Sequence, residues 1–375
     1  MDIEQLLATL ISIDSTNPDL GHGAGESEIA AFVQRWLSEN GVDAFIHDSG
    51  VEQRPNVIGR VSGGDGATLM LNGHLDTVGV GGHVDPFTPR VDARRMYGRG
   101  SMDTKGGLAA LMVAAARAAK EGIGGTVLFT GVADEEFASF GTEAIARDFS
   151  ADAAIVTEPS QLGVTVAHKG FEWYEVEVTG FAAHGSMPDI GIDAIAKMGK
   201  VLVAIEELGV RLASGRTHAL LGTGSIHASL IQGGQEASSY PRSSLLTIER
   251  RTIPGETTRS TTQELQSILG RIADDDSDFN AALRHTLSRS PYEIATDHPF
   301  VELTCAAAEE VLGHPPDITG HSGWMDTAVL GAAGIPSLVL GPVGDGLHGD
   351  VEWVDLDSVH QMADIITGAI RRFCT

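Results

Sequence analysis

The chain has 375 residues, of which 42% are hydrophobic and 20% charged, and it carries a formal net charge of −26 with a pI near 4.7. This length exceeds one ordinary domain and predicts two structural units with an ample apolar core. The negative charge argues against nucleic acids and anionic membranes as partners, because both carry charge of the same sign.

The amino-terminal segment and the cysteines indicate the cellular setting. The first residues, MDIEQLLATLISIDSTNP, carry acids where a signal peptide would carry positive charge, and no uninterrupted apolar run reaches the length of a membrane span. Cys305 and Cys374 lie far apart without C-x-x-C spacing, so neither a disulfide framework nor a cysteine metal site is indicated. We expect a cytoplasmic protein.

Helical and strand patterns alternate over the first part of the chain. Residues 27–40 repeat apolar side chains at helical spacing and stop before Gly41. Short apolar runs follow at NVIGRV, TLMLNG, TVLFTG and AAIVTE, separated by helical stretches such as 105–120. This alternation predicts an α/β fold with a mostly parallel sheet flanked by helices.

The pattern changes in the middle of the chain. FEWYEVEVTG alternates apolar and acidic residues as a half-buried strand does, and two helical segments and three further strands follow. The α/β pattern resumes with helices near 300–312 and 356–373 and the strand PSLVLGP. We therefore expect an α+β unit over 169–288, inserted between the two parts of one domain, 1–168 and 289–375.

The segment LNGHLDTV places His74 and Asp76 just after a predicted strand. If the extended conformation continues, residues two apart point the same way. His74 can then bind a metal while Asp76 accepts its second ring N–H and fixes the tautomer. The alternative is a surface histidine beside an acid in a turn.

Asp103 lies in the glycine-rich segment GRGSMDTKGG, just before a predicted helix. Taken alone, it is interpreted as a residue that caps the helix by accepting hydrogen bonds from free N–H groups. Its carboxylate can instead project from a turn that the glycines permit.

A run of acids follows the strand TVLFTG, where Asp134, Glu135 and Glu136 are consecutive. A solvated acidic turn is one interpretation. The other interpretation gives neighbouring acids different roles, since one carboxylate can bind a metal while the next removes a proton from water. Glu158 comes directly after the strand AAIVT and before Pro159, a position that suits a ligand at a strand end.

His348 lies in the glycine-rich segment GPVGDGLHGD after the last predicted strand. A single histidine in a loop is usually solvated. Together with His74 and the acids, however, it completes a set of nitrogen and oxygen ligands that suits Zn²⁺, Mn²⁺ or Co²⁺. Two ions joined by one bridging carboxylate fit this set better than a single ion.

In their order and spacing, GHLDTV, GRGSMDTKGG, ADEE, TEP and LHGD resemble the metallopeptidase M20 family, as do AAHGSMPDIGIDAI and IERRTIPGE. This family includes acetylornithine deacetylase, succinyl-diaminopimelate desuccinylase, aminoacylase and carboxypeptidase G2. The resemblance covers nearly the full chain. It implies a catalytic domain with an inserted lid domain that often dimerises.

The resemblance also assigns roles to the metal-binding candidates. Asp103 bridges two divalent ions, most simply Zn²⁺, and is followed by a non-proline cis peptide bond. One site is completed by His74 and Glu158 and the other by Glu136 and His348. Glu135 then serves as general base and proton shuttle.

Two residues of the inserted region take roles from the same resemblance. His184 in AAHGSMP is expected to stabilise the oxyanion of the substrate, often from the lid of a partner subunit. Arg251 in IERRTIPGE is expected to grip a carboxylate of the substrate with two hydrogen bonds. The alternatives are a loop histidine and a surface ion pair with Glu249, and Arg250 is expected to point to the opposite face.

The chain departs from its relatives where the substrate is recognised. Many members carry Asn after GG in the lid, whereas GGQEASSYP places Ser238 near that position. The segment HSGWMDTA puts Gly323, Trp324 and Met325 where related enzymes line the substrate pocket, although the last two can equally belong to the core.

The predicted reaction is hydrolysis of the amide bond of an N-acyl amino acid, with Glu135 activating water bound at the metals. A dipeptidase, an aminopeptidase or a carboxypeptidase G2-like peptidase on the same scaffold is the alternative. A catalytically inactive metal-binding protein is disfavoured because Glu135 is retained beside Glu136. We expect a small-molecule or short-peptide substrate and a homodimer formed through the lid.

Overall fold

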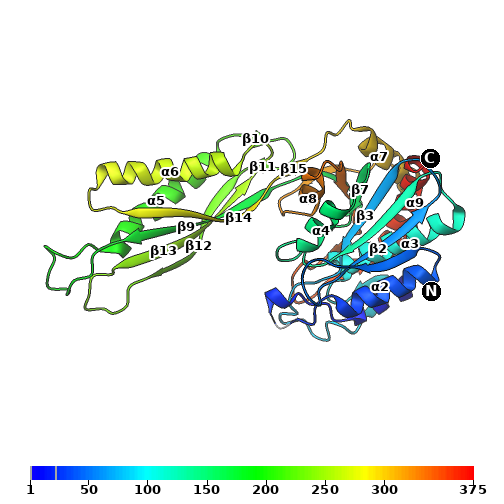
Figure 1. The fold of residues 1–375 in the computed structure, drawn as a ribbon, viewed down its shortest axis with the longest axis horizontal. Helices are drawn as coiled ribbons and strands as arrows, with labels where there is room; N and C mark the ends of the chain where they lie inside the picture. The colour runs from blue at the N-terminus through cyan, green and yellow to red at the C-terminus, as the bar shows by residue number, and fades with distance from the viewer. Residues whose placement is uncertain (1, 22) are drawn as a thin grey trace. The chain divides into compact units, whose positions relative to one another are not determined.

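A computed structural model describes residues 2–21 and 23–375 (Figure 1). The chain divides into two compact units. The first comprises the residues up to Val166 together with Ile294–Thr319 and Met325–Thr375, and the second comprises Ala167–Glu293 and Gly320–Trp324. Each unit has its own sheet and its own helices.

The first unit is built on a central sheet in the strand order β1-β2-β6-β3-β7-β17-β8. The middle strands β6, β3, β7 and β17 run parallel to one another, and β1, β2 and β8 pair antiparallel at the margins. Their bounds are Asp43–His47 (β1), Asn56–Ser62 (β2), Thr68–His74 (β3), Thr126–Val132 (β6), Ala153–Val156 (β7), Val164–His168 (β8) and Ser337–Val339 (β17). The predicted mostly parallel sheet is confirmed.

Helices cover both faces of this sheet, which explains why β6 and β7 are buried along their whole length. α3 and α9 pack on one face, and α4 and α8 lie against β6, β7 and β17 on the other. The bounds are Ile3–Ser12 (α1), Ser27–Glu39 (α2), Gly106–Glu121 (α3), Phe140–Asp148 (α4), Pro299–Leu312 (α7), Thr327–Ala332 (α8) and Leu356–Phe373 (α9). The predicted helices correspond to α2, α3, α7 and α9, whereas α1, α4 and α8 were not predicted.

A smaller four-stranded sheet of the first unit carries the last loop before α9. Its order is β18-β19-β5-β4, and all its pairs are antiparallel. The strands are Arg90–Asp92 (β4), Arg95–Tyr97 (β5), Gly344–Asp345 (β18) and Trp353–Asp355 (β19). Short helical turns lie at Pro18–Leu20 and Ser101–Lys105.

The second unit has an antiparallel sheet in the order β12-β13-β9-β14 with two helices packed on one face. Its main elements are Gly170–Thr179 (β9), Ala194–Ala213 (α5), Ser225–Gly233 (β12), Ser243–Thr252 (β13), Thr258–Asp275 (α6) and Ala281–Arg289 (β14). The short strands Thr217–His218 (β10) and Gly222–Thr223 (β11) pair with each other, whereas Tyr292–Glu293 (β15) and Ile318–His321 (β16) pair with β8.

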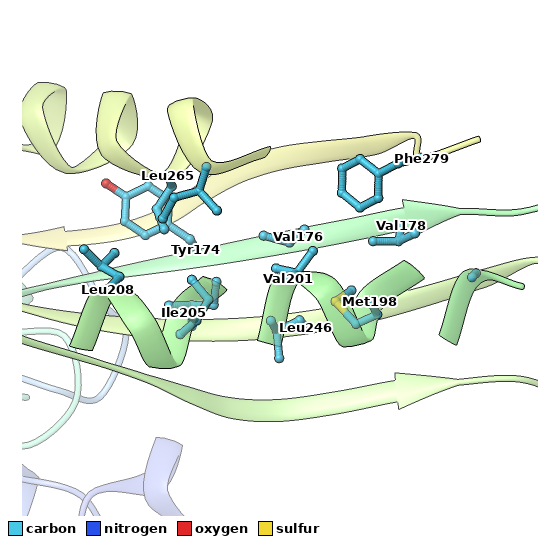
Figure 2. Close-up of a cluster of buried hydrophobic side chains, with 13 residues drawn as sticks. Tyr174, Val176, Val178, Met198, Val201, Ile205, Leu208, Leu246, Leu265 and Phe279 are labelled. Atoms are coloured by element: carbon cyan, nitrogen blue, oxygen red, sulfur yellow. The ribbon is translucent and has the colours of Figure 1, made fainter. Parts of the chain in front are cut away.

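The core of the second unit follows from the alternation in β9. Tyr174, Val176 and Val178 are buried against α5 and α6, where they meet Met198 and Leu265 (Figure 2). The residues between them face away from the helices, because successive side chains of a strand point to opposite faces. This unit therefore keeps one sheet face that its own helices do not cover.

Among the helices described, none combines the length and the apolar character needed to cross a membrane.

Candidate metal centre

Three neighbouring parallel strands bring the predicted site residues to one edge of the central sheet. His74 is the last residue of β3, Glu135 and Glu136 follow β6, and Glu158 comes two residues after β7. Because β6, β3 and β7 are adjacent and parallel, their carboxyl ends meet at the same edge. Open α/β sheets place their ligands at this edge.

Asp103 reaches this edge from the turn that precedes α3. The peptide bond between Asp103 and Thr104 is cis, as the family resemblance predicts. One buried carboxylate, Glu352, organises this turn, since it accepts hydrogen bonds from the backbone N–H groups of Gly100, Met102 and Asp103 at 2.8, 2.9 and 3.1 Å. The loop that carries Asp103 is therefore held by a residue almost 250 positions later in the chain.

His348 lies between β18 and β19 with a φ of 57°, which turns the loop back towards the sheet edge. The buried guanidinium of Arg99 ties this loop to the Asp103 turn. Its Nη1 donates to Glu352 at 2.8 Å and its Nη2 donates to the carbonyl oxygen of Gly349 at 3.0 Å. Two distant loops thus share one hydrogen-bonded frame.

The five predicted ligands form two groups that share Asp103. In one group, Nε2 of His74 lies 3.0 Å from Oδ1 of Asp103 and 3.6 Å from Oε1 of Glu158. In the other, Nε2 of His348 lies 3.3 Å from Oδ2 of Asp103 and 3.3 Å from Oε2 of Glu136. The two oxygens of one carboxylate therefore face the two groups.

The hydrogen bonds of this cluster fit a set of cation ligands. Nδ1 of His74 lies 2.9 Å from the carbonyl oxygen of Asp76, which places the ring proton there and directs the lone pair of Nε2 towards the carboxylates. Within the described chain, Oε1 of Glu136 and Oε1 of Glu158 are buried without a hydrogen-bond partner. Lone pairs and carboxylates directed at one another call for positive charge between them.

The acid–base properties lead to the same conclusion. Burial raises the pKa of Glu158 well above its usual range and that of Glu136 to about 7. Hydrogen bonds to Asp103 and Glu136 raise the pKa of His348 to about 10. Three carboxylates and two imidazoles at this spacing are compatible with divalent cations, which compensate the negative charge.

Glu135 belongs to neither ligand group, although it is adjacent to Glu136 in the chain. Burial, followed by the charge of Glu158, raises its pKa well above the usual range. The carboxylate of Asp76 accepts the backbone N–H of Glu135 at 3.2 Å and that of Glu136 at 3.3 Å. The carboxylate of Asp76 lies 3.5 Å from Nδ1 of His74. The backbone carbonyl oxygen of Asp76 lies closer to this nitrogen, at 2.9 Å. Asp76 thus orients the acidic turn as well as the histidine.

Sequence reasoning missed a second buried acid beside the cluster. Asp326 precedes α8, accepts a hydrogen bond from Thr142 at 2.5 Å and is 1% exposed. Burial raises its pKa to about 6. Its charge raises the pKa of Glu135 and of Glu158, which places it in the same electrostatic environment. The sequence segment HSGWMDTA contains it, but only its neighbours were selected.

A buried network behind the acidic turn was also missed. Asn17 donates to Asp76 at 2.8 Å and to Asp134 at 2.9 Å. Nε of Arg54 donates to Glu26 at 2.8 Å, and its Nη1 lies 3.1 Å from Asp134. Only the buried position of these polar groups in the fold reveals their role, because each looks like an ordinary surface residue in the sequence.

His184 and Ser238 lie in two exposed loops of the second unit that run side by side. His184 pairs with Ser239 in an isolated bridge, and its Nδ1 lies 2.8 Å from the hydroxyl of Ser186. The carbonyl oxygen of Ser238 accepts the N–H of Gly185 at 2.7 Å. The structure brings these two predicted residues together, and their action on a substrate stays a prediction.

Arg251 lies on β13 and donates from Nε to Glu249 at 2.7 Å, so the ion pair named as its alternative role is present. Arg250 is buried on the opposite face, as predicted, and pairs with Glu256. Gly323 donates its N–H to Nδ1 of His321 at 3.0 Å. The remaining N–H groups of Arg251 leave its predicted role as a carboxylate anchor compatible with this pairing.

The comparisons with known proteins agree with this site. The family model for peptidase family M20/M25/M40 matches residues 70–372. The chain belongs to this family. Acetylornithine deacetylase of Vibrio atlanticus (strain LGP32) is 26% identical, with 100% of this chain and 98% of the relative covered. The predicted family membership is therefore confirmed.

Solved structures share the fold of this M20 family member. The aminopeptidase PepT of Bacillus cereus ATCC 10987 superposes with a TM-score of 0.83 at 20% identity, covering 100% of both chains. The YXEP protein of Bacillus subtilis, described as a dinuclear metal binding peptidase from the M20 family, has a TM-score of 0.76 at 16% identity, covering 99% of this chain and 97% of that chain. The chain is accordingly a hydrolase of amide or peptide carbon–nitrogen bonds with candidate metal-ligand groups, as predicted.

Proposed function

We propose that the chain removes the acyl group from an N-acyl amino acid with the help of two divalent cations, Zn²⁺ in the first instance and Co²⁺ or Mn²⁺ as alternatives. The observation that carries the proposal is the sharing of Asp103 between two ligand groups. His74 and Glu158 would complete one ion site, and Glu136 and His348 the other. The acetylornithine deacetylase relative supports the acyl substrate, and the dinuclear YXEP protein supports two ions.

Bound cations would polarise the amide carbonyl and make water more acidic. Glu135 then accepts a proton from water at its carboxylate, and the water oxygen attacks the carbonyl carbon. The carbon–nitrogen bond breaks when Glu135 returns the proton to the leaving nitrogen, which gives a carboxylic acid and a free amine, and the acid then loses its proton to water. The buried position and raised pKa of Glu135 suit a group that must both accept and return a proton.

The second unit would supply the contacts that select the substrate. His184 is proposed to donate to the oxyanion that forms on the carbonyl oxygen. Arg251 is proposed to hold the free carboxylate of the amino acid, since a guanidinium can bind a carboxylate with two parallel hydrogen bonds. Ser238 and Gly323 are proposed to line the remaining substrate surface.

A homodimer through the second unit forms part of the proposal. β12 is an edge strand, and Leu230 and Ile231 on it are 65% and 53% exposed. Val203 and Val210 on α5, which packs beside β12, are 56% and 68% exposed. An exposed apolar edge strand pairs readily with a second copy of itself around a twofold axis. Light scattering should give twice the chain mass, and Leu230→Lys combined with Val210→Glu should give the monomer.

A substrate panel tests the proposed reaction. The protein loaded with Zn²⁺, Co²⁺ or Mn²⁺ should hydrolyse N-acyl amino acids, and exhaustive chelation should abolish the activity until metal is restored. Unblocked dipeptides are the comparison, because the PepT neighbour is an aminopeptidase. Exclusive cleavage of dipeptides would replace the deacylase by the peptidase alternative, and full activity after chelation would overturn both.

A further inference from the structure

On the uncovered face of the sheet in the second unit, three side chains lie side by side on neighbouring strands. Arg251 on β13 and Arg289 on β14 both pair with Phe171 on the central strand β9. Directly paired residues project from the same face of a sheet. Phe171 is three residues before the buried Tyr174, so this row lies on the face opposite the core shown in Figure 2. We call Arg251, Phe171 and Arg289 the cationic row.

Aromatic rings hold the two guanidinium groups of the cationic row. Cζ of Arg251 lies 5.1 Å from the ring centre of Phe171, and Cζ of Arg289 lies 5.5 Å from that of Trp324. The Phe171 and Trp324 rings meet edge to face with their centres 6.5 Å apart. A guanidinium stacked on a ring keeps its N–H groups in its own plane, where they can bind an anion.

A third positive charge, that of Lys169, lies near the cationic row, in contrast with the net charge of −26 on the whole chain. Lys169 lies just before β9, and its pKa is lowered by burial and by the positive charges of Arg251 and Arg250. Glu249 is the facing acid on the next row, and it already accepts hydrogen bonds from Arg251 and from Trp173. This end of the sheet face is therefore suited to an anionic ligand.

The spacing of the row indicates how many anionic groups the ligand carries. Arg251 and Arg289 lie two strands apart, which separates their backbones by roughly 10 Å. A guanidinium that binds a carboxylate with two hydrogen bonds uses both carboxylate oxygens. One carboxylate therefore cannot form such a pair with both arginines at once. A ligand with two carboxylates can place one carboxylate at each arginine.

We propose that the cationic row selects N-acyl derivatives of acidic amino acids, with Arg251 binding the α-carboxylate and Arg289 binding the side-chain carboxylate. This inference rests on the proposed deacylase function and narrows its substrate class. A cationic amino acid side chain, such as that of ornithine, would face Arg289 and be repelled. The substrate of this chain would then differ from the one in the name of its acetylornithine deacetylase relative.

The test compares three substrates that differ only in side-chain charge: N-acetylglutamate, N-acetylglutamine and N-acetylornithine. The metal-loaded protein should show a kcat/KM for N-acetylglutamate at least about tenfold above that for N-acetylglutamine, since a hydrogen bond between two charged groups is stronger than one to a neutral amide. N-acetylornithine should be the poorest of the three. Arg289→Gln should remove the preference for glutamate and leave the value for N-acetylglutamine within about threefold.

Arg284→Gln is the matched control, because Arg284 lies on the same strand and face but opposite Glu175, outside the cationic row. It should leave all three values unchanged. Equal hydrolysis of N-acetylglutamate and N-acetylglutamine, or an equal loss of both in Arg289→Gln, would overturn the inference while the deacylase function stands.

Product binding separates this inference from the proposed function. Calorimetry with L-glutamate and L-glutamine needs no assumption about the acyl group or about turnover. Tighter binding of L-glutamate, lost in Arg289→Gln, supports the cationic row even if the N-acetyl substrates are not hydrolysed. Equal binding of the two amino acids would overturn it.

Discussion

The metal cluster of the first unit and the cationic row of the second unit are built in opposite ways. Asp103 and Glu158 are buried, and backbone N–H groups and neighbouring side chains fix the loops that carry the cluster. Arg251 and Arg289 are only partly buried and rest on aromatic rings on an open sheet face. The proposed chemistry would therefore depend on a rigid frame, whereas the proposed substrate contacts could change without disturbing a core.

The largest effect, on kcat, is expected when the proposed base Glu135 is removed. Glu135→Gln keeps the shape of the side chain but removes its ability to accept a proton, so kcat should fall by about 10³-fold. Metal content, measured on the purified variant, should not change because Glu135 belongs to neither ligand group. An unchanged kcat would remove Glu135 from the mechanism, and a loss of metal would make it a ligand.

The second-largest effect is expected in the second unit. His184→Ala should lower kcat by about 10²-fold if His184 donates to the oxyanion, because such donors act mainly in the transition state. The fold of the variant should be unaffected, since the His184 side chain is exposed and its Nδ1 is hydrogen-bonded to Ser186 in its own loop. Ser214→Ala on the same unit is the control for a change at an exposed site.

Mixing two inactive variants tests where His184 acts. A dimer of one Glu135→Gln subunit and one His184→Ala subunit contains an intact site only if His184 serves the partner. Recovery of activity on mixing is the expected result. No recovery, in a sample shown to contain mixed dimers, would place His184 in the site of its own subunit.

Sequence reasoning predicted that these side chains come together, because three of them, His74, Glu136 and Glu158, follow neighbouring strands. β3, β6 and β7 are apolar runs, and the order of a parallel sheet brings the residues after them to one edge. Each ligand alone resembles a cap or a solvated acid, and only the ordered set indicates a metal. The assignment of Asp103 as the bridge rested on the family resemblance, and the position of Asp103 in both groups agrees with it.

The residues that hold the ligands could not be predicted in the same way. Glu352 follows the His348 loop in the sequence and gives no sign that its carboxylate will accept three backbone N–H groups near Asp103. Arg289 looks like a solvated residue at the end of a strand until the register of β14 places it beside Phe171. Both roles depend on contacts between distant segments, which periodicity does not encode.

We expect an intermediate effect, on metal affinity, when the hydrogen bonds from the Asp103 turn to Glu352 are changed. Glu352→Gln replaces one acceptor oxygen by a donor that faces the N–H groups of the turn, so metal affinity should fall by about 10–100-fold. Competition with a chelator measures this affinity, and saturating metal should restore most of kcat. Glu207→Gln, at an exposed position of α5, is the matched control. Unchanged metal affinity in Glu352→Gln would show that the ligands hold the turn without it.

A buried histidine of the second unit predicts a smaller, pH-dependent effect. Burial lowers the pKa of His168 from 6.5 to about 4, and its Nε2 has no partner in the described chain. The unfolded chain binds the proton first, so this contribution to stability is full above pH 6.5 and is lost as the pH falls towards 4. Relative to His168→Phe, wild type should lose about 1 kcal/mol between pH 7.5 and 5.5.

Urea unfolding at several pH values measures the difference between the two proteins. Because carboxylates titrate in both, only the histidine contributes to the change in that difference. His314→Gln, at an exposed histidine, is the control for the replacement of a histidine. Parallel pH curves for wild type and His168→Phe would mean that the buried ring is not kept neutral.

The smallest effect is expected at Ser238, where this chain departs from its relatives. Its side chain is exposed, and its backbone carbonyl oxygen accepts a hydrogen bond from the N–H of Gly185. Ser238→Ala should therefore leave the fold intact and lower kcat/KM by about two- to tenfold, the effect of one hydrogen bond to a substrate. A larger loss would make this loop part of the catalytic frame and weaken the contrast between the two units. An unchanged kcat/KM would leave substrate selection to the cationic row.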